Sequence, residues 1–448
     1  MEHIAESELA FYAFDPTAVS EERRRAIESH IADCAVCRTA YEFFAVAEED
    51  LSDADVWERN MGSATRESLM AYAARIAEED EEAAELLKPL FDAPARVAWA
   101  NLHRQKRFLN GGVVRQLNAR ALALRESEPL DALTFADAAI AIAEALPDDT
   151  YPAKAIYELR GKAWEHRAVA QTVLGDFAAA YDSLARAERA HKKLASPAFG
   201  LAAVSLIRAS VHYCQQQFAE AEAIAEKAER AYAHLGDDER RMSALFLRGG
   251  IRFEASDLSG AIVLFRQVLD YGESTNNSRW IARSLNALGN CESDRGNLGE
   301  ASMHFQKALA LLREIGPANE RISTQWGIAR VLLRAGKCHE AIRRLRDAAA
   351  EFEARGIVTD AALVSLDIAD GLLALDQTHQ IVNLAARMFR VFTDAGMLTG
   401  ALTALAYIKE AAAAGTLTPD DLQSVRVFLR QAKRQPELLF VRPPTRNR

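Results

Sequence analysis

The segment LGDFAAAY, residues 174–181, returns four times along the chain. The later copies are QQFAEAEA (216–223), SDLSGAIV (256–263), GNLGEASM (296–303) and GKCHEAIR (336–343). The five segments align without internal gaps once the first is shifted by one residue, and their alanines at positions 180, 221, 261, 301 and 341 are separated by 41, 40, 40 and 40 residues. Such regular spacing is the signature of one repeated structural unit.

Small side chains recur around each segment at fixed offsets. They let two helices approach closely, so each unit is predicted to be a pair of packed antiparallel helices. The first set is Ala168, Ala209, Gly249, Gly289 and Ala329, and the second is Ala187, Ala228, Val268, Ala308 and Ala348.

This pattern resembles the tetratricopeptide repeat, with Leu288-Gly289, Gly296-Asn297-Leu298 and Ala301 as the best match. The period of 40 exceeds the usual 34, which predicts longer helices or connecting loops. Weaker units flank the clear ones, at Phe135–Ala139 before them and at Ala369, Asp376, Ile381 and Met388 after them. We therefore expect an all-α fold with about seven units over residues 111–432, arranged as a right-handed α-solenoid.

A solenoid of this type presents a concave groove lined by the first helix of each pair and usually binds a protein or peptide. Polar and aromatic side chains on three of these helices could grip a backbone amide or a carboxylate. The alternative is that they are ordinary solvated positions. The candidate groove residues are Arg248, Arg252, Arg283, Asn286, Asn290, Trp326 and Arg330.

The sharpest chemical pattern is His30-Ile-Ala-Asp-Cys34-Ala-Val-Cys37. A helix is predicted before it, capped by Ser20, and on that helix residues four apart share a face. His30, Cys34 and Cys37 could therefore hold one ion. A structural zinc site needs four ligands, and His3 is the candidate for the fourth.

The N-terminal pattern resembles the bacterial zinc-binding anti-sigma factor module over residues 1–50, a small three-helix domain. This resemblance implies that His3, His30, Cys34 and Cys37 bind zinc, that a further helix spans 38–48, and that the partner is a sigma factor. Two alternatives stay open: the three side chains simply pack, or the cysteines form a redox-active dithiol that releases zinc on oxidation.

Charge and composition narrow the function further. The net charge is −10, yet residues 1–90 contain 22 acidic and 8 basic side chains. The excess of acidic side chains in this N-terminal segment disfavours direct binding to nucleic acid.

No apolar stretch is long enough to span a membrane and the N-terminus is acidic, so we expect a cytoplasmic protein. Cys214, Cys291 and Cys338 are expected to pack as small apolar residues.

Residues 51–110 are predicted to be a helical linker that contains the acidic run Glu78–Glu82. Such runs are usually solvated, and the alternative is a helix that docks on the array. Residues 433–448 are expected to form a flexible tail. No catalytic signature is present. The sequence thus predicts a non-enzymatic regulatory adaptor that sequesters a sigma factor. The alternatives are a scaffold with a structural zinc cap, or a peptide-sensing regulator.

Overall fold

The structure is a computed structural model in which the described residues are almost entirely helical. They form eighteen α-helices and two short 3₁₀-helices, with no strand among them, which confirms the all-α solenoid. The described residues are 4, 12, 21–34, 37, 38, 41, 63–92, 98–125, 128–147, 151, 153–194, 196–315, 318–394, 399–432 and 438–443.

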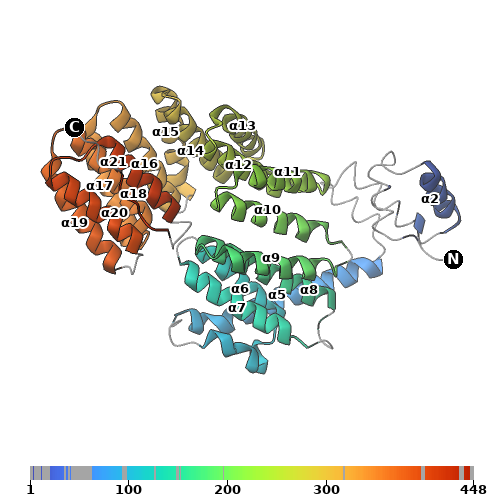
Figure 1. The fold of residues 1–448 in the computed structure, drawn as a ribbon. Coiled ribbons are helices and arrows are strands. Elements are labelled where there is room, and N and C mark those ends of the chain that lie inside the picture. Colours follow the sequence, from blue (N-terminus) through green and yellow to red (C-terminus); the bar gives the residue numbers. More distant parts are fainter. Residues whose placement is uncertain are drawn as a thin grey trace.

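The helices follow one another in pairs from α6 onward (Figure 1). In chain order they are α2 (Glu21–Asp33), α5 (Ser63–Asp92), η2 (Trp99–Arg104), η3 (Lys106–Phe108), α6 (Gly111–Leu124), α7 (Pro129–Ala145), α8 (Ala153–Val173), α9 (Phe177–His191), α10 (Ala198–Cys214), α11 (Phe218–His234), α12 (Asp238–Glu254), α13 (Leu258–Ser274), α14 (Ser278–Asp294), α15 (Leu298–Ile315), α16 (Ala318–Arg334), α17 (Cys338–Ala354), α18 (Val358–Ala374), α19 (Thr378–Asp394), α20 (Thr399–Ala413) and α21 (Pro419–Ala432).

The period of 40 comes from long helices with tight turns. From α10 to α19 each helix starts 20 residues after the one before it, and all but α15 span 17 residues. Turns of three residues join most of them. The extra length over a 34-residue repeat therefore lies in the helices, one of the two possibilities expected from the sequence.

The three-residue turns share one backbone geometry. Its middle residue has a positive φ, at 86° for Gly296 and 52° for Asn276. The residue after it often caps the next helix, because an Asp or Asn oxygen accepts from a free N–H of the first turn. The Asp257 carboxylate accepts from the Gly260 amide at 2.9 Å. Each helix thus ends and the next begins within three residues.

Small residues mark the places where helices touch. The five alanines that define the repeat are fully buried. A Cβ atom added to Gly249 of α12 would lie 2.5 Å from Cε1 of Phe265 on α13, so only glycine fits there. The small-residue pattern therefore reports the close approach of paired helices.

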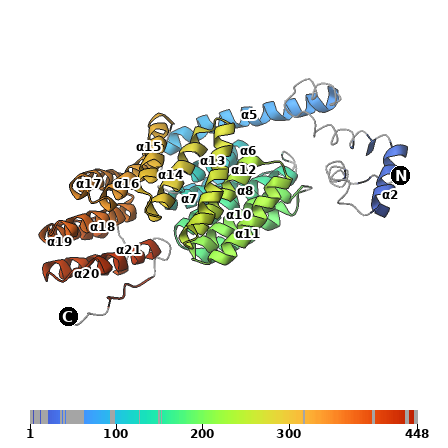
Figure 2. The ribbon, with the colours of Figure 1, turned by 90° about the horizontal axis from the view of Figure 1, so that it is seen from above.

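Between α6 and α21 the described residues contain eight helix pairs, one more than the seven expected. The last pair, α20 and α21, departs from the stacking: α21 packs against α18 as well as α20. Arg426 of α21 forms ion pairs with Asp367 at 3.0 Å and with Asp370, both on α18. Figure 2 shows α21 beside these two helices at the C-terminal end.

The helix α5 precedes the array and docks on it. Its Ala83 and Leu87 are buried in the core that contains α6 and α7. Arg115 of α6 holds Glu79 at 3.1 Å and Asp80 at 2.8 Å. The acidic run is therefore partly a docking surface rather than wholly solvated. Figure 2 shows α5 extending past the repeat helices at its N-terminal end.

No α-helix among the described residues combines the length and apolar character needed to cross a membrane.

Candidate functional site

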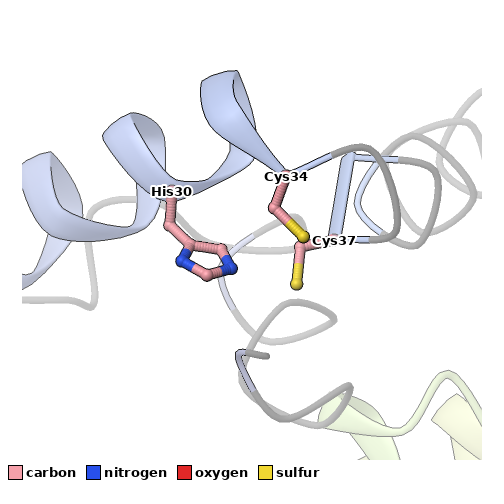
Figure 3. Close-up of side chains that lie close together, drawn as sticks. All are labelled: His30, Cys34 and Cys37. Carbon is pink, nitrogen blue, oxygen red and sulfur yellow. The ribbon is translucent and has the colours of Figure 1, made fainter. Parts of the chain in front are cut away.

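The predicted metal ligands converge at the end of α2. The Cys34 amide donates to the His30 carbonyl at 2.8 Å, and the Arg38 amide donates to the Cys34 carbonyl at 2.9 Å, so helical bonding continues past Cys34. This winding places His30, Cys34 and Cys37 on one side, with their ligand atoms all within 4.8 Å of one another. Figure 3 shows the imidazole and both sulfur atoms gathered below the helix.

The surroundings of these side chains suit an ion. Cys34 and Cys37 are buried in a small apolar cluster with Tyr12 and Ile27. The His30 Nε2 atom is buried and has no hydrogen-bond partner among the described residues. A buried polar atom without a partner is costly, and zinc bound to imidazole nitrogen would remove that cost. The donor set of one imidazole and two thiols therefore fits zinc.

The N-terminus reaches this cluster. Burial raises the pKa of the Cys37 thiol, and a hydrogen bond from the backbone of Ile4 acts in the opposite direction. Ile4 also packs against the apolar cluster. His3, the predicted fourth ligand, lies outside the described residues, as do Ser20 and most of the helix expected over 38–48.

Four of the predicted groove residues, Arg283, Asn286, Trp326 and Arg330, contact a neighbouring first helix of the repeats. The Thr324 hydroxyl of α16 donates to Asn286 Oδ1 at 3.1 Å. Trp326 Nε1 donates to Asp367 of α18 at 2.6 Å. Arg330 lies between Asp294 and Asp367, at 3.8 and 4.0 Å. These polar side chains are thus half-buried and already bonded within the chain.

Arg283 contacts α12 in this way, whereas Asn290 is bonded within its own helix. Arg283 of α14 stacks over the rings of Phe246, at 4.6 Å from the centroid, and Trp280, at 5.1 Å. The Asn290 amide donates to the Asn286 carbonyl at 3.1 Å. A partner that binds this face therefore meets side chains whose positions are set before it arrives.

Arg248 and Arg252 of α12, the other two predicted groove residues, contact carboxylates of the preceding helix. Arg248 contacts Glu222 at 2.9 Å and Glu229 at 2.5 Å, both on the preceding helix α11. Arg252 contacts Glu222 at 3.0 Å. Both side chains therefore join two consecutive repeats rather than neighbouring first helices.

The other cysteines mostly pack as expected. Cys291 and Cys338 are buried and Cys214 is half-buried, and all three are free thiols. Burial raises the pKa of Cys291 to about 12. A thiol with so high a pKa forms little thiolate near neutral pH and is chemically inert.

Sequence reasoning missed a cavity of about 380 Å³ between α5, α6 and α8. Its wall includes Glu79, Asn118 and Tyr151, which are far apart in sequence. The sequence signal nearest to this cavity is the acidic run Glu78–Glu82, which contains Glu79.

Comparison with known proteins agrees with the repeat geometry. Residues 280–353 match the tetratricopeptide repeat family. The helix pairs thus form a solenoid of tetratricopeptide-like hairpins. A Rap protein complexed with competence and sporulation factor has a similar fold, with a TM-score of 0.53 and 16% identity over 71% of this chain and 88% of that chain. Aspartyl phosphate phosphatase F from Bacillus subtilis gives a TM-score of 0.49 and 14% identity, covering 87% and 95%. The comparison with curated protein sequences gives no match.

Proposed function

We propose that this protein is a non-catalytic regulatory adaptor with two binding parts. The N-terminal module holds zinc and sequesters a sigma factor, and the tetratricopeptide array binds a second protein or a peptide. The two parts are joined through α5, which docks on the first helices of the array.

The cluster of His30, Cys34 and Cys37 carries this proposal. Three ligand atoms of the types that zinc prefers lie within 4.8 Å, and one of them is a buried nitrogen without a partner. With His3 as fourth ligand, zinc is surrounded by protein atoms and holds the module together. A closed site of this kind leaves no position for a reactive water, which supports a structural rather than a hydrolytic role.

The excess of acidic side chains in the N-terminal segment supports a protein partner for the module. Residues 1–90 have 14 more acidic than basic side chains, and such a surface attracts a basic protein surface. The module would act by covering the surface through which a sigma factor contacts the polymerase. The identity of this partner follows from the resemblance of residues 1–50 to anti-sigma modules.

The array supports a second binding event. Trp326, Arg330 and Asn286 present a polar face across α14, α16 and α18 whose bonds are already made. A face fixed in advance loses little conformational entropy when a partner binds. A protein with a similar fold has been solved with a bound factor, which supports the same use of the array here.

Zinc content of the purified full-length protein tests the metal site. After anaerobic purification we expect about one zinc per chain. Cys37→Ser should lose most of it, and Cys214→Ser is the matched control because it changes a cysteine on α10 outside the cluster. Equal zinc in wild type and Cys37→Ser would overturn the site.

Affinity purification from the native host tests the partner. The wild type should retain a sigma factor that a His30→Ala/Cys34→Ser variant loses, while a His379→Ala/Cys214→Ser control keeps it. Trp326→Ala should lose a different protein or peptide and keep the sigma factor. Absence of any sigma factor from the wild-type sample would exclude the proposed role of the module.

A second reading, a scaffold with a purely structural zinc cap, is favoured by one observation. In the apolar cluster of the module, two of the buried side chains, Cys34 and Cys37, are themselves predicted ligands. Small domains are often stabilised by such a metal. Under this reading the His30→Ala/Cys34→Ser variant loses zinc and its N-terminal fold but keeps every partner.

A further inference from the structure

The cavity between α5, α6 and α8 has the size and lining of a small-molecule site. Its volume of about 380 Å³ lies within the usual range for ligand pockets. Apolar side chains from all three helices supply much of the wall, together with the ring of Tyr151. The apolar lining residues are Ile76, Ala119, Ala155 and Leu159.

Three cations line the cavity, and each already holds a carboxylate. Arg75 contacts Glu79 at 3.3 Å, and Arg115 contacts the same side chain at 3.1 Å. Lys162 contacts Glu165 at 2.9 Å. An anionic ligand would have to displace these carboxylates, so the positive side chains do not form an anion site.

The three cations of the cavity wall are balanced by ion-pair partners. These partners are Glu79, which lines the cavity, and Asp80 and Glu165, which do not. Glu158 has no ion-pair partner among the described residues, and it is exposed at the cavity wall. An unpaired carboxylate beside an apolar cavity favours a cationic ligand.

Two further polar groups in the wall can accept hydrogen bonds. Asn118 is 6% exposed, and its Oδ1 atom is buried without a partner among the described residues. Burial lowers the pKa of His166 to about 4, so its imidazole is neutral at pH 7 and keeps one accepting nitrogen. Of these acceptors only Asn118 Oδ1 is buried without a partner among the described residues, and a buried acceptor left unpaired is costly. Glu158 and His166 add further accepting atoms at the cavity wall.

We propose that this cavity binds a primary amine attached to an apolar body. The ammonium group donates to Glu158 and to Asn118 Oδ1, and the body lies against Ile76, Leu159 and the ring of Tyr151. A free amine and the amino-terminal residue of a peptide share this chemistry. The proposal does not depend on zinc or on a sigma factor.

Ligand binding at this place would act on α5. This helix supplies Arg75, Ile76 and Glu79 to the wall, and the Tyr151 hydroxyl donates to Glu79 at 3.1 Å. A ligand that contacts α5, α6 and α8 together stabilises the docked position of α5 by mass action. The site is thus placed to link a small molecule to the helix that precedes the array.

Isothermal titration calorimetry on the full-length protein tests the proposal. The probes are 2-phenylethylamine, its N-acetylated form, which lacks the charge, and 3-phenylpropanoate, which reverses it. The tripeptide Phe-Gly-Gly and its N-acetylated form provide the peptide arm. We expect the free amine or the free tripeptide to bind and the three uncharged or anionic probes not to bind. The stronger of the two amines identifies the source of the ligand.

Variants separate this site from adventitious binding. Glu158→Gln keeps the shape of the side chain and removes its charge, and should weaken amine binding about tenfold. Asn118→Leu should weaken it as well, and Glu314→Gln on α15, an exposed control, should leave it unchanged. The amine should also slow hydrogen exchange in α5 between Arg75 and Leu87.

Three results would overturn the proposal. Neither amine binds at millimolar concentration; the acetylated or anionic probe binds as tightly as the amine; or Glu158→Gln binds like the wild type while circular dichroism shows an unchanged helix content. Because these readouts involve neither metal nor partner protein, they stand apart from the tests of the adaptor function.

Discussion

Gly249 and Gly250 are neighbours in α12, yet alanine should have opposite effects at the two positions. A Cβ atom at Gly249 would lie 2.5 Å from Cε1 of Phe265, whose ring is 3% exposed. A Cβ atom at Gly250 would meet no atom within 4 Å. The two variants therefore make the same chemical change in the same helix and differ only in the space available.

The expected magnitudes follow from these contacts. Alanine in the interior of a helix is favoured over glycine by about 1 kcal/mol, which Gly250→Ala should gain in full. Gly249→Ala gains the same amount but must displace the Phe265 ring, and overpacking of this kind costs about 1–3 kcal/mol. The ring is held in the core by Leu288 and Cys291. We therefore expect the two variants to differ by about 1–3 kcal/mol, with Gly249→Ala the less stable.

Native-state hydrogen exchange of α12 and α13 is the suitable assay. Repeat arrays open locally, so a single global unfolding free energy describes them poorly. A difference of about 1–3 kcal/mol corresponds to about a 5- to 150-fold difference in the protection of these amides. If both alanines raise protection equally, the helices are further apart than the structure shows, and close packing does not explain the small-residue repeat.

Three more predictions concern single side chains. Arg248→Met should destabilise the α11–α12 contact by about 2 kcal/mol, measured by native-state hydrogen exchange of these two helices, since Glu222 and Glu229 lose their shared partner; Glu314→Gln should change nothing there. His166 has a pKa of about 4 when folded and about 6.5 when unfolded, so the unfolded chain binds the proton first and stability falls by up to about 3 kcal/mol from pH 6.5 to 4; His166→Gln should flatten this profile. Arg426→Met should speed hydrogen exchange in α21 and spare α12–α17, and unchanged exchange in α21 would show that its ion pairs do not hold it.

The helix pairs could be predicted because their cause is local and repeated. Two helices can approach closely only where a small residue lies at their crossing. Because each unit needs such a residue, small residues recur in the sequence about every 40 residues. The spacing of 20 residues between successive helix starts has a weaker sequence signal. Some turns have glycine in the left-handed conformation, as at Gly296, but others place Gln216 or Ser256 there, with φ of 62° and 66°. Those side chains are unusual in that region and give no sequence signal for a turn.

The grouping of His30, Cys34 and Cys37 was predictable for a similar reason. His30 and Cys34 lie four residues apart on one helix, so helical geometry alone brings them together, and Cys37 follows three residues later. The fourth ligand depends on a different part of the chain. The structure brings the backbone of Ile4 to Cys37, which keeps His3 as the candidate without placing it.

Long-range partners explain what the sequence did not reveal. The sequence shows a charged side chain at Arg248, but only the fold shows that it donates hydrogen bonds to Glu222 and Glu229 of α11. The cavity is the extreme case, because α5, α6 and α8 each contribute only part of its wall. No residue there stands out alone: Asn118 is one polar position on a helix, and Glu158 is one exposed carboxylate. Their grouping around one cavity exists only after three helices pack. A periodic sequence pattern can therefore predict the helix pairs and give no signal for a cavity between them.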